Sequence, residues 1–496
     1  SFSIQPDENR AGTRLSGAAV VRLGAKPEFD AVISGGVLSL PPLDMRKNQQ
    51  QVPYSLVHLL NEIPPPFVPG MAGRIGVDIA ELDLRSFALR KVRIDATTDG
   101  KSWQLADFTG LLAGNSRLTL SGKVSNVDEK PAFAGTLKLA TSRLDALARL
   151  WRREDARNPL FNIQAFLGAD ITLENGKLGI ANGKFTLDKQ VHDFAVQLQL
   201  AGDRNALISA RLKPMSVRQS EALAALLPDF SGDGRFKTSF PSGSLDVAAE
   251  KATLFDLEGK NLALQMDWGE GGIKIVRASA QDLGGARLSL SGNLSGPPSS
   301  PSISGNGRIT LTKAARDGFL ARFLSTAGSG EIVQGALARS LPLNATFKLA
   351  APDESQGQKF SAQGRAGIAD FQVSVEVKDR IANFVNAPLL INASITSDQP
   401  DALSEQLGLG ANSPLDPGKP VSIVMIGQGT LLNSLETTLV AKAGTDRVGF
   451  AGTLILSDLA KLRGRGLLDF ALSDPYPLLQ LAGMDGIHLG AIEGTS

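Results

Sequence analysis

Cysteine is absent from all 496 residues, which excludes disulfides, thiolate zinc sites and thiol nucleophiles. Aromatic residues make up only 5%, so platforms that stack nucleic-acid bases are not expected. Charge of one sign is also lacking: 51 basic residues against 50 acidic ones give a net charge of +1. This balance argues against binding to nucleic acid and against electrostatic attraction to anionic lipid headgroups. No apolar run reaches the roughly 18 to 20 residues of a membrane span.

Sequence motifs of catalysis are lacking too. The chain has no phosphate-binding G-x-x-x-x-G-K-[ST], no G-x-S-x-G and no complete G-x-G-x-x-G. Its three histidines, His58, His192 and His488, are far apart and are interpreted as isolated surface or core residues. The acidic pair Asp128-Glu129 is predicted to lie in a turn. We therefore expect no enzyme activity, no metal and no cofactor, although a distant carboxylate pair of a glycan hydrolase stays open.

The chain begins Ser1-Phe2-Ser3-Ile4, without an initiator Met, a basic segment or an apolar segment. This start resembles the middle of a strand. We expect the chain to be a portion of a longer protein, whose signal or anchor would lie upstream.

What the sequence does contain is alternation of apolar and polar residues. Leu262, Leu264, Met266 and Trp268 follow this period of two, as do residues 194–200 and 371–377. Successive strand side chains point to opposite faces, so each segment has one apolar and one more polar face. An antiparallel sheet with one solvated face is expected. The turns between strands are predicted where Asn, Asp and Gly gather, at 98–100, 174–176, 181–183 and 232–234.

Short amphipathic helices are predicted between the strands. The spacing of Leu144, Leu147, Leu150 and Trp151 predicts a helix over 143–151, with Thr141 or Ser142 as its cap. Further helices are expected over 220–227, where Pro228 would end the helix, and over 313–323, 401–409 and 477–484. The proline-rich segment 63–69 is predicted to be a stiff, extended connection.

An internal repeat connects these elements. Residues 111–139 align without a gap to 281–309, an offset of 170 residues, and nine of the 29 positions are identical. A partial third copy relates 133–139 to 450–456, followed by a helical stretch over 457–462. The unit is strand, turn, strand and helix, and such units stack side by side. Chance similarity among β-rich segments remains the alternative.

The predicted fold class is mostly β with short helices, in an elongated, curled, mainly antiparallel sheet built from internal repeats. We divide the chain into an N-terminal β segment (1–78), which the missing upstream part would leave truncated, repeat unit 1 (79–240), repeat unit 2 (241–400) and a C-terminal partial repeat (401–496).

At these residues the chain resembles the AsmA family of bacterial envelope proteins. The similar stretches are 105–122, 133–139 with its helix, 285–292 and 450–456. The resemblance implies a periplasmic protein held in the inner membrane by a helix that lies outside this chain. It also implies a relation to bridge-like lipid-transfer proteins, and a role in handling phospholipid and in outer-membrane biogenesis. Phospholipid or another lipid would be the main partner, with envelope proteins as further candidates.

The residues expected to line an apolar groove are the aliphatic positions of the clearest strands: Leu118, Leu120, Leu137, Leu139, Val196, Leu198, Leu262, Leu264, Leu288, Leu290, Val373 and Val375. Plain core packing is the alternative for each of them. A closed core would instead fit a non-enzymatic scaffold or regulator of outer-membrane protein assembly.

Overall fold

The computed structural model describes most of the chain. The residues described are 2–4, 15–39, 60, 63–84, 87–150, 158–226, 240–296, 301–327, 335, 337–353, 355–384, 386–408, 416, 418–431, 433–455, 463–474, 476 and 492–495.

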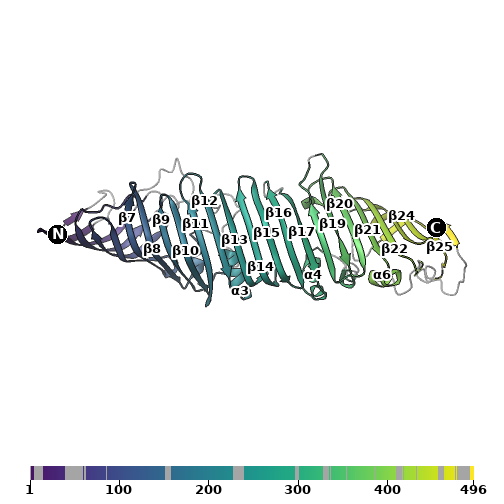
Figure 1. Ribbon diagram of the computed structural model, residues 1–496, viewed down its shortest axis with the longest axis horizontal. Helices are drawn as coiled ribbons and strands as arrows, with labels where there is room; N and C mark the ends of the chain where they lie inside the picture. Colours follow the sequence, from purple (N-terminus) through teal and green to yellow (C-terminus); the bar gives the residue numbers. More distant parts are fainter. Residues whose placement is uncertain are drawn as a thin grey trace. The chain divides into compact units, whose positions relative to one another are not determined.

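The chain divides into two compact units. Unit 1 comprises Ser1–Thr253 with Asp267–Glu270, and unit 2 comprises Leu254–Met266 with Gly271–Ser496. Each is built mainly from strands that lie side by side (Figure 1). The predicted fold class, mostly β and mainly antiparallel with short helices, is confirmed.

The strands of unit 1 follow one another in the sheet in chain order. They are β1 (Phe2–Ile4), β2 (Leu15–Arg22), β3 (Glu28–Ser39), β4 (Ala72–Asp83), β5 (Ala88–Asp99), β6 (Trp103–Leu112), β7 (Ser116–Val127), β8 (Lys130–Thr141), β9 (Ala165–Glu174), β10 (Lys177–Leu187), β11 (Gln190–Gln199), β12 (Asn205–Leu212) and β13 (Ser242–Leu254). Two neighbouring pairs, β3–β4 and β12–β13, are parallel. The other pairs are antiparallel.

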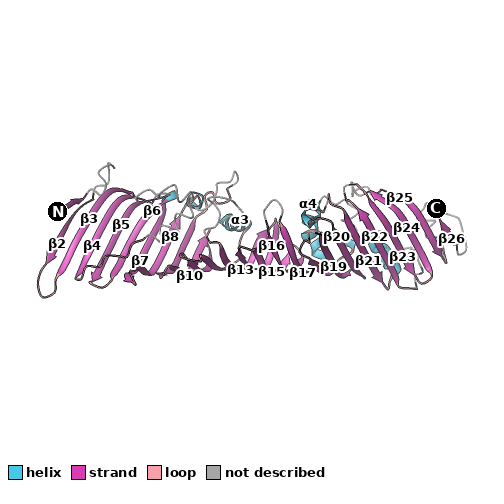
Figure 2. Ribbon diagram, turned by 90° about the horizontal axis from the view of Figure 1, so that it is seen from above, coloured by secondary structure: helices cyan, strands magenta, loops and turns pink. Residues whose placement is uncertain are grey.

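The strands that follow are β14 (Leu257–Gly269), which contributes residues to both units, and those of unit 2. These are β15 (Gly272–Leu283), β16 (Ala286–Ser295), β17 (Ser302–Leu311), β18 (Leu343–Leu349), β19 (Gln358–Ala366), β20 (Ala369–Val377), β21 (Leu389–Ser397), β22 (Val421–Gly429), β23 (Leu435–Ala443), β24 (Asp446–Ile455), β25 (Arg463–Leu472) and β26 (Ile492–Thr495). From β15 to β26 every neighbouring pair is antiparallel (Figure 2).

Helices are few and short. The α-helices are α2 (Leu144–Ala148), α3 (Val217–Leu226), α4 (Phe319–Ala327) and α6 (Pro400–Leu407), and the 3-10 turns are η1 (Ala113–Asn115), η3 (Lys313–Arg316) and η4 (Ile381–Asn383). Four of the five predicted helices are thus confirmed in kind, and the fifth, over 477–484, lies outside the described residues. The predicted cap of the first is wrong. Thr141 Oγ1 accepts the Arg143 backbone N–H, and the N-cap, Arg143, makes no side-chain cap bond.

Turn residues fold as predicted at most positions. Asp128 and Glu129 both have positive φ and close the β7–β8 hairpin, and Asn175-Gly176 closes β9–β10 in the same way. Asn182-Gly183 was predicted to be a turn, and this is wrong. Asn182 has positive φ inside β10, where the register shifts against both neighbours, so the pair forms a β-bulge. The turn predicted at 232–234 lies outside the described residues.

The 170-residue repeat is reproduced in three dimensions. β7, β8 and α2 correspond to β16, β17 and the η3–α4 segment. Gly122 lies directly opposite Gly135, and at the same offset Gly292 lies opposite Gly305. The helix predicted after the third copy, over 457–462, lies outside the described residues.

Paired glycines bring the two strands of each hairpin close together. A Cβ on Gly135 would lie 2.0 Å from the Ser121 carbonyl oxygen and 2.7 Å from the Gly122 Cα. Both contacts involve backbone, which moves much less readily than a flexible side chain. The absence of a side chain here is therefore required by the strand pairing.

Gly135→Val is expected to lower the midpoint of thermal unfolding, because overpacking against backbone costs about 1–3 kcal/mol or more. Gly76→Val is the matched control, since a Cβ on that strand glycine would meet nothing within 4 Å. Circular dichroism melting curves of both variants test this. Equal melting of Gly135→Val and the control would contradict the tight packing of the glycine pair.

Candidate functional site

On one face of the sheet in unit 2, a row of apolar residues runs without interruption across eleven strands. The register places one residue of each strand from β15 to β25 in a single row: Ala278, Leu290, Gly307, Phe347, Ala362, Val373, Ala393, Met425, Leu439, Phe450 and Leu468. We call this the central row of unit 2. It contains no polar side chain, and the face that carries it is called the apolar face.

Unit 1 has an equivalent row. From β2 to β13, cross-strand pairing connects Ala19, Ala31, Ile75, Ala96, Leu105, Gly122, Gly135, Ile171, Ile180, Val196, Ile208 and Leu245. Every position is apolar or glycine. The two parallel pairs preserve the pattern, because residues in register on parallel strands also share a face.

The burial of these residues shows that no second layer covers the row. All eleven residues of the central row of unit 2 are half-buried, and none is fully buried. In a two-layer core such positions would be enclosed on every side. In unit 1 the six positions from Gly122 to Ile208 are half-buried in the same way. The apolar face is therefore open along its middle.

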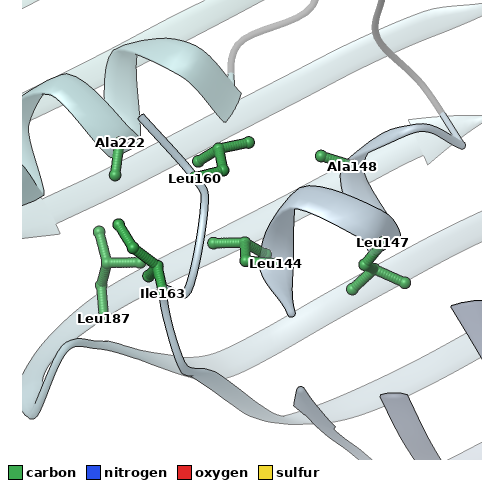
Figure 3. Close-up of a cluster of buried hydrophobic side chains, with 7 residues drawn as sticks. All are labelled: Leu144, Leu147, Ala148, Leu160, Ile163, Leu187 and Ala222. Atoms are coloured by element: carbon green, nitrogen blue, oxygen red, sulfur yellow. The ribbon is translucent and has the colours of Figure 1, made fainter. Parts of the chain in front are cut away.

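Fully buried clusters lie instead at the strand ends. In unit 1, α2, α3 and the segment 158–163 cover a cluster of Leu144, Leu147, Ala148, Leu160, Ile163, Leu187 and Ala222 (Figure 3). In unit 2, α4 and α6 lie at the strand ends (Figure 1), where Leu320 and Leu403 are buried in two further clusters. A third cluster of unit 2 contains Leu389 and Leu435 at the opposite strand ends. The apolar face of unit 2 thus has a core along each edge and an open middle.

An ion pair between a buried aspartate and a partly exposed arginine fixes α2 at this edge in unit 1. The Asp145 carboxylate, 4% exposed, accepts bonds of 2.9 and 2.8 Å from Arg143 Nε and Nη2. The Arg143 guanidinium holds the pKa of Asp145 below its usual range, and the same bonds raise the pKa of Arg143. Arg143 also lies 5.4 Å from the centre of the Phe161 ring. We interpret this group as structural.

Phenylalanine rings on the apolar face lie against glycines of the neighbouring strand. A Cβ on Gly307 would lie 2.5 Å from Cζ of Phe347, which is its cross-strand partner. Gly183 and its partner Phe194 have the same relation at 2.6 Å. Each glycine therefore leaves the space that the ring occupies. The rings lie over the glycines of the neighbouring strand, so the apolar surface continues from one strand to the next.

The twelve predicted groove residues are all half-buried. Leu118 lies opposite Leu139 and Leu120 opposite Leu137, so the register brings these four together. Val196 and Leu198 lie opposite Ile180 and Leu178, Leu288 and Leu290 opposite Ile309 and Gly307, and Val373 and Val375 opposite Ala362 and Phe360. Leu262 and Leu264 alternate on β14.

Some of these residues belong to the edges and not to the open middle. Leu118, Leu139, Leu288 and Val375 pack against the buried clusters at the strand ends. Sequence reasoning missed Phe347 and Met425 of the central row. The alternation within 343–349 was the signal for Phe347, whereas 423–426 are four consecutive apolar residues and give no such signal for Met425.

The opposite face is mostly polar, with a few exposed apolar residues such as Val424 and Ile426, and ion pairs cross its strands. Arg74 Nη2 lies 2.8 Å from Asp95 Oδ2, Arg211 Nη1 lies 3.0 Å from Asp246 Oδ1, and Lys359 Nζ lies 2.7 Å from Glu376 Oε1. Pairing between opposite charges keeps this face close to neutral, although each exposed pair adds little stability. We call it the polar face.

His192 is the described histidine, and it is a fully buried core residue, as one of the two sequence interpretations had it. Its Nδ1 accepts the Lys213 backbone N–H at 3.1 Å, and its ring centre lies 4.8 Å from that of Phe185. Burial lowers the pKa of His192, and the neighbouring Asp193 opposes that shift more weakly. His58 and His488 lie outside the described residues.

Among the residues that the structure describes, no group of three or more His, Asp or Glu side chains could hold a metal ion. No helix in the described ranges is long and apolar enough to cross a membrane. Comparisons with protein-family models, with curated proteins and with solved structures found no match.

His192 predicts a loss of stability in mild acid. Because its pKa in the folded protein lies below the ordinary 6.5, the unfolded chain binds a proton that the folded chain does not bind below about pH 6.5. Stability should fall as the pH drops through this value, by at most about 1.4 kcal/mol per pH unit. His192→Gln offers an acceptor that does not titrate. Its melting midpoint should therefore change less between pH 7.5 and 5.5, and an equal change in both proteins would contradict this role.

Proposed function

We propose that the chain binds the acyl chains of lipids along its apolar face and so handles or transfers phospholipid. The observation that carries the proposal is the central row of unit 2, in which eleven consecutive strands each contribute an apolar or glycine residue that stays half-exposed. A soluble protein rarely leaves so long an apolar surface open without an occupant.

The energetics favour an acyl chain as that occupant. Each CH₂ group exposed to water costs about 0.8 kcal/mol, so a lipid moving through an aqueous space needs an apolar surface along its whole chain. The aliphatic and phenylalanine side chains of the row supply such a surface. Because they include no polar or charged group, they bind by area alone and do not discriminate between headgroups.

The dimensions fit more than one lipid. Neighbouring strands are about 4.8 Å apart, so the eleven strands of the central row of unit 2 extend over about 48 Å. The hydrocarbon core of a bilayer is about 30 Å thick, and an acyl chain therefore reaches about 15 Å. Lipids can lie in series along the row.

The resemblance to the AsmA family extends the proposal to a cellular setting. In that setting the chain is the periplasmic part of a protein anchored in the inner membrane by a segment outside this sequence. It would support outer-membrane biogenesis by carrying phospholipid. The alternative, a non-enzymatic scaffold with a closed core, is less well supported, because a closed core would enclose the central row.

Lipid mass spectrometry of the gently purified chain tests the binding. We expect phospholipid to copurify in at least equimolar amounts, since the open row extends over several acyl-chain lengths. A chain purified without any lipid, and unable to take up fluorescent phospholipid from vesicles, would contradict the proposal.

Leu290→Asp tests the row itself. Leu290 is half-buried and its side chain borders open space, so the variant should fold while phospholipid uptake falls severalfold. Ser289→Asp, one residue away on the exposed polar face, should change neither property.

Leu311→Asp provides the comparison for a true core position, since Leu311 is 4% exposed beneath η3 and α4. An unpaired charge there should unfold the surrounding strands. If Leu290→Asp unfolds to the same degree as Leu311→Asp, the face is closed and the proposal is wrong.

A further inference from the structure

The polar face of unit 2 contains a trough that the apolar face does not explain. Two hollows of about 660 and 680 Å³ lie over the strands β17 to β22. Both are lined by Thr346, Gln363, Gln372 and Ser394, so they adjoin and form one depression. We call this depression the polar trough.

Cross-strand register shows which side chains face the polar trough. Three rows on the polar face supply them: Asn344, Arg365, Asp370 and Thr396; Arg308, Thr346, Gln363, Gln372 and Ser394; and Lys348, Ser361, Ser374 and Asn392. All thirteen are polar, and most carry hydroxyl or amide groups. Lys359 also lines the trough, and on β22 two of the rows continue as Val424 and Ile426, whose exposed side chains form an apolar end of the trough. The phenylalanines at the lining, Phe347 and Phe371, belong to the apolar face by alternation.

Several basic side chains without a partner gather in the polar trough. Some arginines elsewhere on the polar face, such as Arg74 and Arg211, instead pair with an acid on the neighbouring strand. Within the described part of the chain, the side chains of Arg308, Lys348 and Arg365 form no ion pair or hydrogen bond. Asp370, which lies opposite Arg365 in the register, is the one acidic residue in the lining, and the trough therefore carries a net positive charge.

The spacing of these cations suits a ligand with several separated anionic groups. Arg308 lies one strand and one row from Lys348, about 8 Å between backbones, and two strands and one row from Arg365, about 12 Å. A chain with repeated carboxylates along its length can contact all three at once.

We propose that the polar trough binds an acidic oligosaccharide. Guanidinium and ammonium groups pair with its carboxylates, while serine, threonine, asparagine and glutamine side chains both donate to and accept from sugar hydroxyls. Single-stranded nucleic acid, the other anionic polymer, requires aromatic side chains for base stacking, and the thirteen side chains of the trough include none. This site is independent of the lipid proposal, because it lies on the opposite face of the sheet.

Isothermal titration calorimetry of the full chain with tetragalacturonate, which carries one carboxylate on each sugar, tests the proposal. We expect binding that weakens as salt is added. The double variant Arg308→Gln with Arg365→Gln should weaken it about tenfold or more, since both charge partners are removed. Arg117→Gln, an exposed arginine on the polar face of unit 1, is the matched control and should bind as the unaltered chain does.

Two further probes separate the contributions of charge and hydroxyl groups. Neutral maltotetraose and tetraglutamate, which has the charge without the hydroxyls, should each bind more weakly than tetragalacturonate. Three results would overturn the proposal: no binding of tetragalacturonate, equal binding by the double variant, or equal binding of tetraglutamate. Lipid uptake by the double variant should be unchanged, so failure of this site leaves the lipid proposal intact.

Discussion

Each strand pairs with its neighbours in a register that sets apolar residues opposite apolar residues, and both faces of the sheet follow from that pairing. A slip of one residue would exchange the faces of a strand and place charges in the apolar row. Several features hold the register: tight turns such as Asp128-Glu129, the bulge at Asn182, and the close approach of Gly122 to Gly135. The burial of the edge clusters adds a further restraint, because only one register brings those residues beneath the helices.

The same register allows one sheet to serve two chemistries. Along β19 and β20, Phe360 and Val375 face one side while Lys359 and Glu376 pair on the other. Short helices enclose only the strand ends, where Leu311 and Leu403 are buried. The middle keeps its apolar surface because no element of the described structure crosses it. Stability thus comes from the edges and from strand pairing, which leaves the central residues available for binding.

Much of this fold could be predicted from the sequence, because alternation within a strand is a local property. The strand around Phe371 and Val373, the hairpin at Asp128 and the 170-residue repeat all follow from residues close together in the chain. Local pattern misled at Asn182-Gly183, since the same dipeptide serves a turn and a bulge, and only the neighbouring strands decide between them. The pairing of Gly307 with Phe347 depends on residues forty positions apart. Whether a second layer covers Leu290 is likewise a tertiary property, because alternation looks the same on an open face and on a closed core.

In the part of the chain that the structure describes, strands pair with the strands before and after them in the sequence, as in the hairpin of Gly292 and Gly305 that repeats the hairpin of Gly122 and Gly135. A sheet of this kind has no closure condition, whereas a barrel must satisfy a fixed strand number and stagger. Duplication of a hairpin with its helix therefore adds length without disturbing the residues already in place. The length of the apolar row can consequently change during evolution in steps of one repeat.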